Sequence, residues 1–236
     1  MHESRFLCLA VSRRDGGKCI AGIDIDSHKW IRPVDANSHG AVNNGQAVVS
    51  EGRNQIRWLS SLDIVLLPLG NSVGTTIQPE NWELLSVTNQ KAYEIVRRFD
   101  PRQDMRILME HLEDRGPLLH SYGDSISPPV LGARKLSHSL SLIEPDDLHW
   151  KVAPKLKYPA DLQVRAEFIF DGDRYNISVT DSEWETRCRR AGQGRHKNTE
   201  VADPRKPRIL LVVSLGAEPF NGQHYKFVAS VLAFPT

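Results

Sequence analysis

The first third of the chain alternates short hydrophobic runs with polar turns. The segments 6–12, 20–25 and 29–34 are rich in apolar and β-branched residues, and turn-forming residues lie between them. Runs of this length with such boundaries are typical of β-strands. We therefore predict three antiparallel strands here, the last two joined as a hairpin. The run 62–69 (LDIVLLPL) is the clearest apolar segment of this half and predicts a buried strand.

The pattern changes in the middle of the chain. Apolar residues recur there at steps of three and four, and Asp100-Pro101 interrupts them. This spacing places the apolar side chains on one face of a helix, so we predict two helices, over 90–99 and 102–114. The segment 123–129 (GDSISPP) is loop-like and predicts a domain boundary.

The second half returns to strand-like runs. Asp171-Gly172-Asp173 separates two of them, and because Asp-Gly tolerates the positive φ of a tight turn, it predicts a hairpin. The segment 180–183 can cap a short helix over 184–191. Residues 192–206 are polar, basic and glycine-containing, which predicts a mobile loop. The strands predicted in this half are 130–135, 139–144, 147–152, 162–170, 174–179, 208–215 and 225–234.

Composition places the chain among ordinary globular proteins. Of its 236 residues, 40% are hydrophobic and 25% are charged, unlike the composition of a disordered chain. The formal net charge is +1, so any electrostatic attraction for nucleic acid must be local.

The cysteines and the apolar runs bear on the compartment. Cys8, Cys19 and Cys188 lack the short Cys/His spacing of a metal site, so we expect reduced thiols. The N-terminus does not have the pattern of a signal peptide, and no apolar run approaches the about 20 residues of a membrane span. We therefore expect a cytoplasmic protein that does not enter the membrane.

The number of strand candidates predicts the fold class. Each strand-rich part holds about five of them in roughly 90–110 residues, which suits a small Greek-key barrel of the OB type. We predict a β-rich α+β fold in which two OB-like five-stranded barrels are joined by a short helical connector. The corresponding domains are 1–88, 89–128 and 129–236. A β-sandwich or one larger mixed sheet remains an alternative.

Several blocks of sequence resemble a known family. They are CLAVSRRDGGKCIAGIDIDSHKWIRPV near the start, DIVLLPL followed by QPENW, and then YNISVTDSEWE, LLVVSLG and YKFVAS near the end. In this order they are similar to the bacterial family called the dual OB-containing domain, over roughly 5–85 and 130–234. The resemblance implies two OB barrels, binding of nucleic acid or nucleotides, and a place in prokaryotic mobile or anti-phage defence loci. It implies no catalytic residues.

The opening hairpin is the first candidate for binding. OB barrels hold single strands with a basic groove and stacking aromatic side chains, and a base stacked on Trp30 would contribute about 1–3 kcal/mol. Arg32 could pair with a phosphate in fork geometry. The alternative is structural: Trp30 packs in the barrel, and Arg32 pairs with an internal carboxylate such as Asp24 or Asp63. The candidates in this hairpin are Arg13, Lys29, Trp30 and Arg32.

Two further basic segments are candidates. In the segment 187–208, eight positive residues outnumber Glu200 and Asp203, which makes it the most plausible contact for phosphates. Lys151, Lys155, Lys157 and Tyr158 form a weaker basic rim with an aromatic ring. Both segments also fit a solvated surface without a partner. The positive residues of the first segment are Arg187, Arg189, Arg190, Arg195, Lys197, Arg205, Lys206 and Arg208.

The sequence contains no recognisable catalytic motif. Carboxylate pairs such as Asp171/Asp173 lie in predicted turns, where aspartate is favoured for local hydrogen bonding. The histidines do not cluster, and neither a phosphate-binding nor a dinucleotide-binding glycine loop is present. We therefore predict a non-enzymatic module without cofactor or metal. It is expected to bind nucleic acid, single-stranded DNA or RNA, and to serve a prokaryotic defence or DNA-processing system with partner proteins of the same operon. The alternatives are a protein-interaction scaffold and a sensor of a small nucleotide-like ligand.

Overall fold

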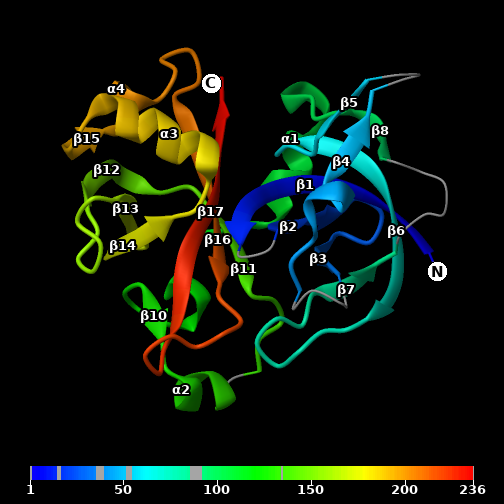
Figure 1. The fold of residues 1–236 in the computed structure, drawn as a ribbon, viewed down its shortest axis with the longest axis horizontal. Coiled ribbons are helices and arrows are strands. Elements are labelled where there is room, and N and C mark those ends of the chain that lie inside the picture. Colours follow the sequence, from blue (N-terminus) through cyan, green and yellow to red (C-terminus); the bar gives the residue numbers. More distant parts are fainter. Residues whose placement is uncertain are drawn as a thin grey trace. The chain divides into compact units, whose positions relative to one another are not determined.

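The chain forms two compact units. The computed structural model describes residues 2–14, 17–35, 40–51, 55–85, 92–133 and 135–235. Unit 1 consists of Met1–Glu110 and Leu136–His138, and unit 2 consists of His111–Lys135 and Ser139–Thr236 (Figure 1). Strands dominate both units, and short helices accompany them.

Five strands of unit 1 close into a barrel. Their order is β1-β2-β3-β7-β6, and a further ladder between β1 and β6 completes the ring. β3 and β7 run parallel, whereas the other neighbours run antiparallel. A closed five-stranded Greek-key arrangement is the OB architecture, so the prediction of a first OB-like barrel is confirmed. The strands are β1 (His2–Arg14), β2 (Gly17–Asp24), β3 (Lys29–Val34), β6 (Asp63–Ser72) and β7 (Asn81–Leu84).

Strand β1 serves two neighbours. Its residues His2–Leu7 pair with β6, and Phe6–Arg14 pair with β2 past a bulge between Cys8 and Ala10. A bulge bends a strand and increases its twist, which lets β1 pass from one neighbour to the other. Gly22 of β2 lies where the backbones approach most closely, because a Cβ atom there would be 2.0 Å from the backbone oxygen of Leu7.

Three more strands extend the wall of the barrel beyond β6. β8 (Tyr93–Arg98) pairs with β6, and β4 (Val48–Ser50) connects β8 to β5 (Ile56–Trp58). Val49 and Tyr93 bury their side chains in the barrel core. The short helix η1 (Asn44–Gln46) precedes β4.

The prediction of a helix over 90–99 is wrong. Residues 93–98 form β8, and residues 90 and 91 lie outside the described residues. Buried Tyr93 and exposed Glu94 also fit a strand, and the ladders to β6 and β4 decide between the two periods. The second helix exists as α1 (Pro101–Glu110), which ends four residues before the predicted end.

Unit 2 repeats the strand order of the barrel as an open sheet. β12, β13, β14, β17 and β16 follow one another, and β14 and β17 run parallel. Within the described residues, no ladder joins β12 to β16; β11 (Leu140–Ile143) pairs with β16 instead, and Glu144 and Pro145 separate it from β12. A second closed barrel is therefore not confirmed, although the strand order is present. The five strands are β12 (Asp146–Pro154), β13 (Leu162–Phe170), β14 (Asp173–Val179), β16 (Arg208–Leu215) and β17 (His224–Phe234).

Short strands complete this sheet. β15 (Gly194–Lys197) pairs with β12, β9 (Leu112–Glu113) pairs with β11, and β10 (Ser125–Ile126) pairs with β17. β9 and β10 lie within 89–128, the segment predicted as a helical connector, and both belong to unit 2.

The strand predicted over 130–135 is wrong. Residues Pro128–Gly132 form helix α2 instead, with its prolines at the first helical positions. Proline suits this place because its φ is helical and its missing N–H would have no partner there. Residue 134 lies outside the described residues.

The helix predicted over 184–191 is confirmed as α3 (Ser182–Ala191). Asp181 caps it, since Oδ1 accepts a hydrogen bond from the Trp184 N–H at 2.9 Å. The ring of Trp184 packs against that of Trp150 on the inner side of β12, with 5.2 Å between centroids. The loop predicted over 192–206 is wrong, because it contains β15 and α4 (Asn198–Val201). The short helix η2 spans Leu118–His120.

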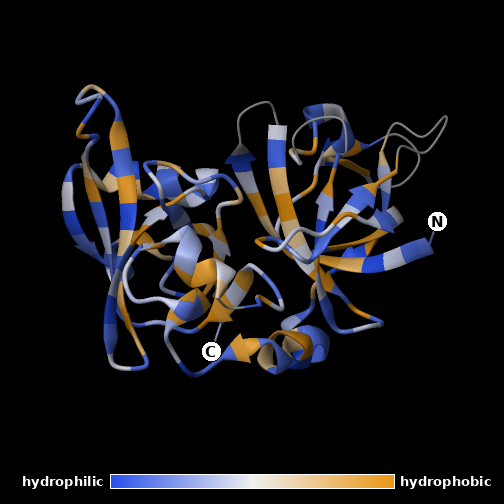
Figure 2. Ribbon diagram, turned by 90° about the horizontal axis from the view of Figure 1, so that it is seen from below, coloured by the Kyte–Doolittle hydropathy of each residue, from blue (hydrophilic) through white to orange (hydrophobic). Residues whose placement is uncertain are grey.

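Hydrophobic and hydrophilic residues alternate along the strands, as expected for sheets with one buried face. Figure 2 shows hydrophobic and hydrophilic residues interleaved along them. In β13, for example, every second side chain is buried, from Val164 to Phe170. Among the described residues, no helix has the length and apolar character needed to cross a bilayer.

Candidate nucleic-acid interface

The aromatic ring of the opening hairpin is buried. Trp30 is only 9% exposed, and its ring lies 6.2 Å from that of His138. Five of the six residues of β3 are buried. A base therefore has no access to Trp30 in this arrangement, and the packing alternative fits the geometry.

Arg32 is also buried, and it pairs with a carboxylate that the sequence reasoning did not name. Its Nε lies 3.1 Å from Oε1 of Glu80, on the chain just before β7. Of the expected partners, Asp63 pairs with Arg57, and Asp24 accepts hydrogen bonds from Ser4 and Ser27. Arg32 therefore links β3 to β7 inside the barrel. Arg13 and Lys29 are exposed at the ends of their strands.

The positive residues of 187–208 are distributed over several elements. Arg187 and Arg189 pair with Glu183 and Glu185 one turn earlier on α3. Arg195 pairs with Glu167, Arg205 with Asp203 and Arg208 with Glu144. For Arg190, Lys197 and Lys206 the described part of the chain offers no ion pair. Much of the positive charge predicted for this segment is thus neutralised locally.

Arg195 belongs to a row of cations across the sheet of unit 2. Lys151 of β12 lies directly opposite Arg195 of β15 on one side and directly opposite Arg165 of β13 on the other. Directly opposed residues of antiparallel strands point to the same side of the sheet. The buried neighbours Trp150, Val152, Val164 and Ala166 point to the other side, into the core. We call the surface formed by Arg195, Lys151 and Arg165 the cationic face.

This arrangement is electrostatically unfavourable by itself. Like charges directly opposite each other destabilise a sheet. Two of the three are compensated: Nε of Arg195 lies 2.7 Å from Glu167, and Nη2 of Arg165 lies 2.7 Å from Asp124. Lys151, between them, is exposed and has no carboxylate partner in the part of the chain that the structure describes. The row therefore retains an uncompensated positive charge that an anion could neutralise.

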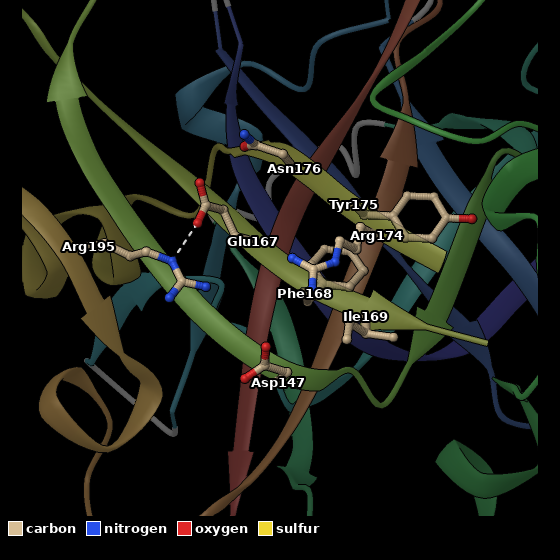
Figure 3. A pocket seen from close by; sticks show the side chains of 8 residues that line it. All are labelled: Asp147, Glu167, Phe168, Ile169, Arg174, Tyr175, Asn176 and Arg195. Atoms are coloured by element: carbon tan, nitrogen blue, oxygen red, sulfur yellow. Dashed lines mark hydrogen bonds and ion pairs between the residues drawn. The ribbon is translucent and has the colours of Figure 1, made fainter. Parts of the chain in front are cut away.

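A shallow cavity of about 250 Å³ lies beside the row (Figure 3). Arg195 and Glu167 lie at one side of it, joined by their ion pair, and Arg174 and Asn176 reach it from β14. Its volume is below the roughly 300–1,000 Å³ of usual small-molecule sites, so it suits part of an extended ligand better than a whole enclosed one. The remaining lining residues are Asp147, Phe168, Ile169 and Tyr175.

The loop between β12 and β13 continues the cationic face. Lys155 and Lys157 lie in it, Leu156 is 99% exposed and Tyr158 is 59% exposed. Nζ of Lys157 lies 5.8 Å from the centre of the Tyr158 ring, and Lys155 pairs with Asp161 at 3.6 Å. An exposed ring with cations around it can stack a base while the cations meet phosphates.

Sequence reasoning missed Arg165 of the cationic face and Arg174, which lines the cavity beside it. Both were visible as outward positions of the alternating strands 162–170 and 174–179. Arg187 and Arg190 line a different cavity between α3 and α4, together with the carboxylates of Glu183 and Asp203.

The structure offers little for metal or thiol chemistry. Among the described residues, no group of three or more His, Cys, Asp or Glu side chains is arranged to hold a metal ion. Burial raises the pKa of the Cys188 thiol to about 12 and raises the pKa of Cys8 as well. Both thiols are therefore protonated and unreactive near neutral pH.

The closed barrel of unit 1 and the related strand order of unit 2 define an OB-containing protein with a cationic sheet face. The model of the family described as the dual OB-containing domain matches residues 4–231, and the chain belongs to this family. Neither the curated proteins nor the solved structures include a match to this chain.

Proposed function

We propose that this protein binds single-stranded nucleic acid across the cationic face of unit 2. The observation that carries the proposal is the row Arg195–Lys151–Arg165, in which Lys151 has no carboxylate partner among the described residues. OB barrels bind oligonucleotides on the face of their second and third strands and on the loop between the first two. By order and pairing, those elements are here β13, β14 and the loop 155–161.

In the proposed mechanism, cations bind the phosphates and one aromatic ring, that of Tyr158, stacks on a base. Lys151 and Arg195 neutralise phosphates, and Arg195 can use the N–H groups not engaged by Glu167. Tyr158 stacks a base at about 1–3 kcal/mol, and this stacking needs an unpaired strand because duplex bases are already stacked. In this proposal β11 and β12 together act as the first strand of a second OB barrel.

The wider role is proposed only from the resemblance to the family. We propose a cytoplasmic, non-enzymatic recognition subunit in a bacterial defence or DNA-processing system, with partner proteins from the same operon. The buried, protonated thiols of Cys8 and Cys188 are compatible with a reducing compartment.

The test is fluorescence anisotropy with a labelled oligothymidylate of about 12 nucleotides, its RNA counterpart and a duplex of the same length. We expect tighter binding of the single strands and a log–log salt slope of about −0.7 for each phosphate neutralised. The double variant K151A/R195A should weaken binding about tenfold or more at low salt.

Matched controls separate this face from general positive charge. Lys29→Ala in unit 1 and Lys206→Ala in unit 2 each remove an exposed lysine elsewhere, and neither should change the affinity more than about twofold. The absence of binding to every strand at low salt would refute the proposed function. If the control variants lost as much affinity as K151A/R195A, the assignment of the binding site to the cationic face would be refuted.

A further inference from the structure

A segment preceding β10 is anchored to the sheet of unit 2 by side chains. We call this segment, residues 116–124, the strap. The N–H of Gly116 donates to Oδ2 of Asp171 at 2.8 Å, and the N–H of Leu118 donates to the Tyr175 hydroxyl at 3.0 Å. Its far end carries Asp124, which reaches the cationic face.

Lys226 of β17 fixes the far end of the strap. Its side chain is 1% exposed, and Nζ donates to the carbonyl of Ser121 and, at 3.0 Å, to that of Gly123. Its backbone N–H donates to the carbonyl of Asp124 at 2.8 Å. Lys226 thus donates to three carbonyl groups within residues 121–124, and these contacts position the carboxylate of Asp124.

Asp124 in turn forms an ion pair with Arg165. Nη2 of Arg165 donates to Oδ2 of Asp124 at 2.7 Å and also to the carbonyl of Asn176. Nε donates to Oδ1 of Asn176 at 2.6 Å, and Nη1 donates to the Ser178 hydroxyl at 2.9 Å. A guanidinium has five N–H groups, so four of them are engaged within unit 2. With a single N–H remaining, Arg165 can donate two hydrogen bonds to a phosphate only if one of these acceptors leaves.

Asp124 is the acceptor best suited to leave. The two partners on β14 are part of the sheet, whereas Asp124 lies at the end of the strap and its side chain is partly exposed. A phosphate oxygen and a carboxylate oxygen make similar charge-assisted bonds to a guanidinium. Exchanging one for the other therefore preserves the bonds of Arg165 and releases Asp124.

We propose that Asp124 is a built-in competitor for nucleic-acid phosphate, which occupies Arg165 in the free protein and is displaced when a strand binds. Lys226 acts as a positioning residue that strengthens this competition by holding the strap. The proposal rests on the proposed function, because the displaced contact lies within the cationic face.

The first test is Asp124→Asn, measured by anisotropy with the same labelled oligothymidylate. Removing the competing charge should tighten binding about three- to tenfold and steepen the salt slope by about 0.7, the value for one more phosphate contact. Asp146→Asn is the matched control, because it makes the same change in charge at an exposed position of β12. In an Arg165→Gln background the gain from Asp124→Asn should vanish.

The second test reverses the sign expected from simple charge counting. Lys226→Met removes a lysine whose pKa is lowered to about 7, and with it part of a positive charge at neutral pH, yet it should tighten binding about twofold or more because the strap no longer holds Asp124 in place. Lys206→Met makes the same substitution at an exposed lysine without this contact and should leave binding unchanged or weaker. Circular dichroism and thermal unfolding check that the variants fold, and the Asp124→Asn result does not depend on Lys226→Met.

The outcomes separate the two proposals. Equal effects of Asp124→Asn and Asp146→Asn would overturn the proposal that Asp124 competes with phosphate, and so would a gain that persists in the Arg165→Gln background. Either result would leave the proposed function standing. A wild-type protein that binds no strand overturns the proposed function. It also overturns the proposal that Asp124 competes with phosphate, unless the Asp124→Asn variant does bind a strand.

Discussion

Arg32 and Glu80 form an ion pair inside the barrel of unit 1, with 3.1 Å between Nε and Oε1 and both side chains nearly inaccessible to solvent. The residues are 48 positions apart, and the backbone N–H of Arg32 also donates to the carbonyl of Glu80 at 2.9 Å. The pair lies where β3 meets β7, a parallel contact that no tight turn can enforce. It therefore joins the two parts of the chain that complete the barrel.

Glu80→Gln should destabilise the protein strongly. The substitution leaves the charge of Arg32 buried without its carboxylate, which typically costs about 3–5 kcal/mol in the free energy of unfolding. Urea unfolding followed by circular dichroism measures it. Asp203→Asn, which breaks the exposed pair with Arg205, is the control and should have no measurable effect. A Glu80→Gln protein as stable as the control would show that the pair does not hold the barrel.

Lys226 should make the stability of the protein depend on pH. Burial lowers the pKa of Lys226 to about 7, and the carboxylate of Asp124 opposes this shift. In the unfolded chain the pKa returns to its ordinary value of 10.5, so between these values the unfolded state binds more protons than the folded state. Stability should therefore rise as the pH increases from about 7, with a slope of at most about 1.4 kcal/mol per pH unit from this group.

The measurement compares the wild type with Lys226→Met by urea unfolding at pH 7, 8 and 9. Other groups titrate in both proteins, so the difference between the two slopes reports on Lys226. The wild type should gain stability relative to Lys226→Met as the pH rises. Parallel curves would contradict the buried, deprotonating lysine.

Gly22→Ala should destabilise unit 1, whereas Gly132→Ala should not. A Cβ at position 22 would lie 2.0 Å from the Leu7 oxygen, so β1 and β2 would have to separate where β1 bends. Overpacking of this kind costs about 1–3 kcal/mol. Gly132 ends α2 and has no atom within 4 Å of an added Cβ, so alanine there should be neutral or stabilise by about 0.5–1 kcal/mol. Thermal unfolding of both variants decides the prediction.

The sequence predicted those elements whose signal is local. The hairpin of β13 and β14 follows from Asp171-Gly172, and both residues do adopt positive φ. Helix α3 follows from its capping residues. β8 was mistaken for a helix because its residues fit both periods, and the choice depends on ladders to β6 and β4, which are distant in the sequence.

The candidate site shows the same division. The alternation of β13 was enough to place Arg165 on its outward side. That Arg165 lies opposite Lys151 depends on the register between β12 and β13. The position of the third cation, Arg195, depends on β15, which is more than 40 residues from β12 in sequence and is not joined to it by a turn. The sequence did not identify Glu80 as the partner of Arg32 for the same reason, because no local sequence signal shows that β3 pairs with β7.

Lys151→Glu should stabilise the free protein and weaken nucleic-acid binding at the same time. The wild-type lysine faces Arg195 and Arg165, and replacing it with a carboxylate converts two repulsive cross-strand pairs into attractive ones, each worth about 0.2–1 kcal/mol. The same carboxylate would repel phosphates at the centre of the cationic face. Lys206→Glu changes the net charge equally but lies outside the row, so it should leave stability unchanged and weaken binding less. Urea unfolding and anisotropy on the same preparations measure both effects. A residue selected for packing would lose stability on charge reversal, so opposite signs in the two assays would identify Lys151 as a position retained for binding at the expense of stability.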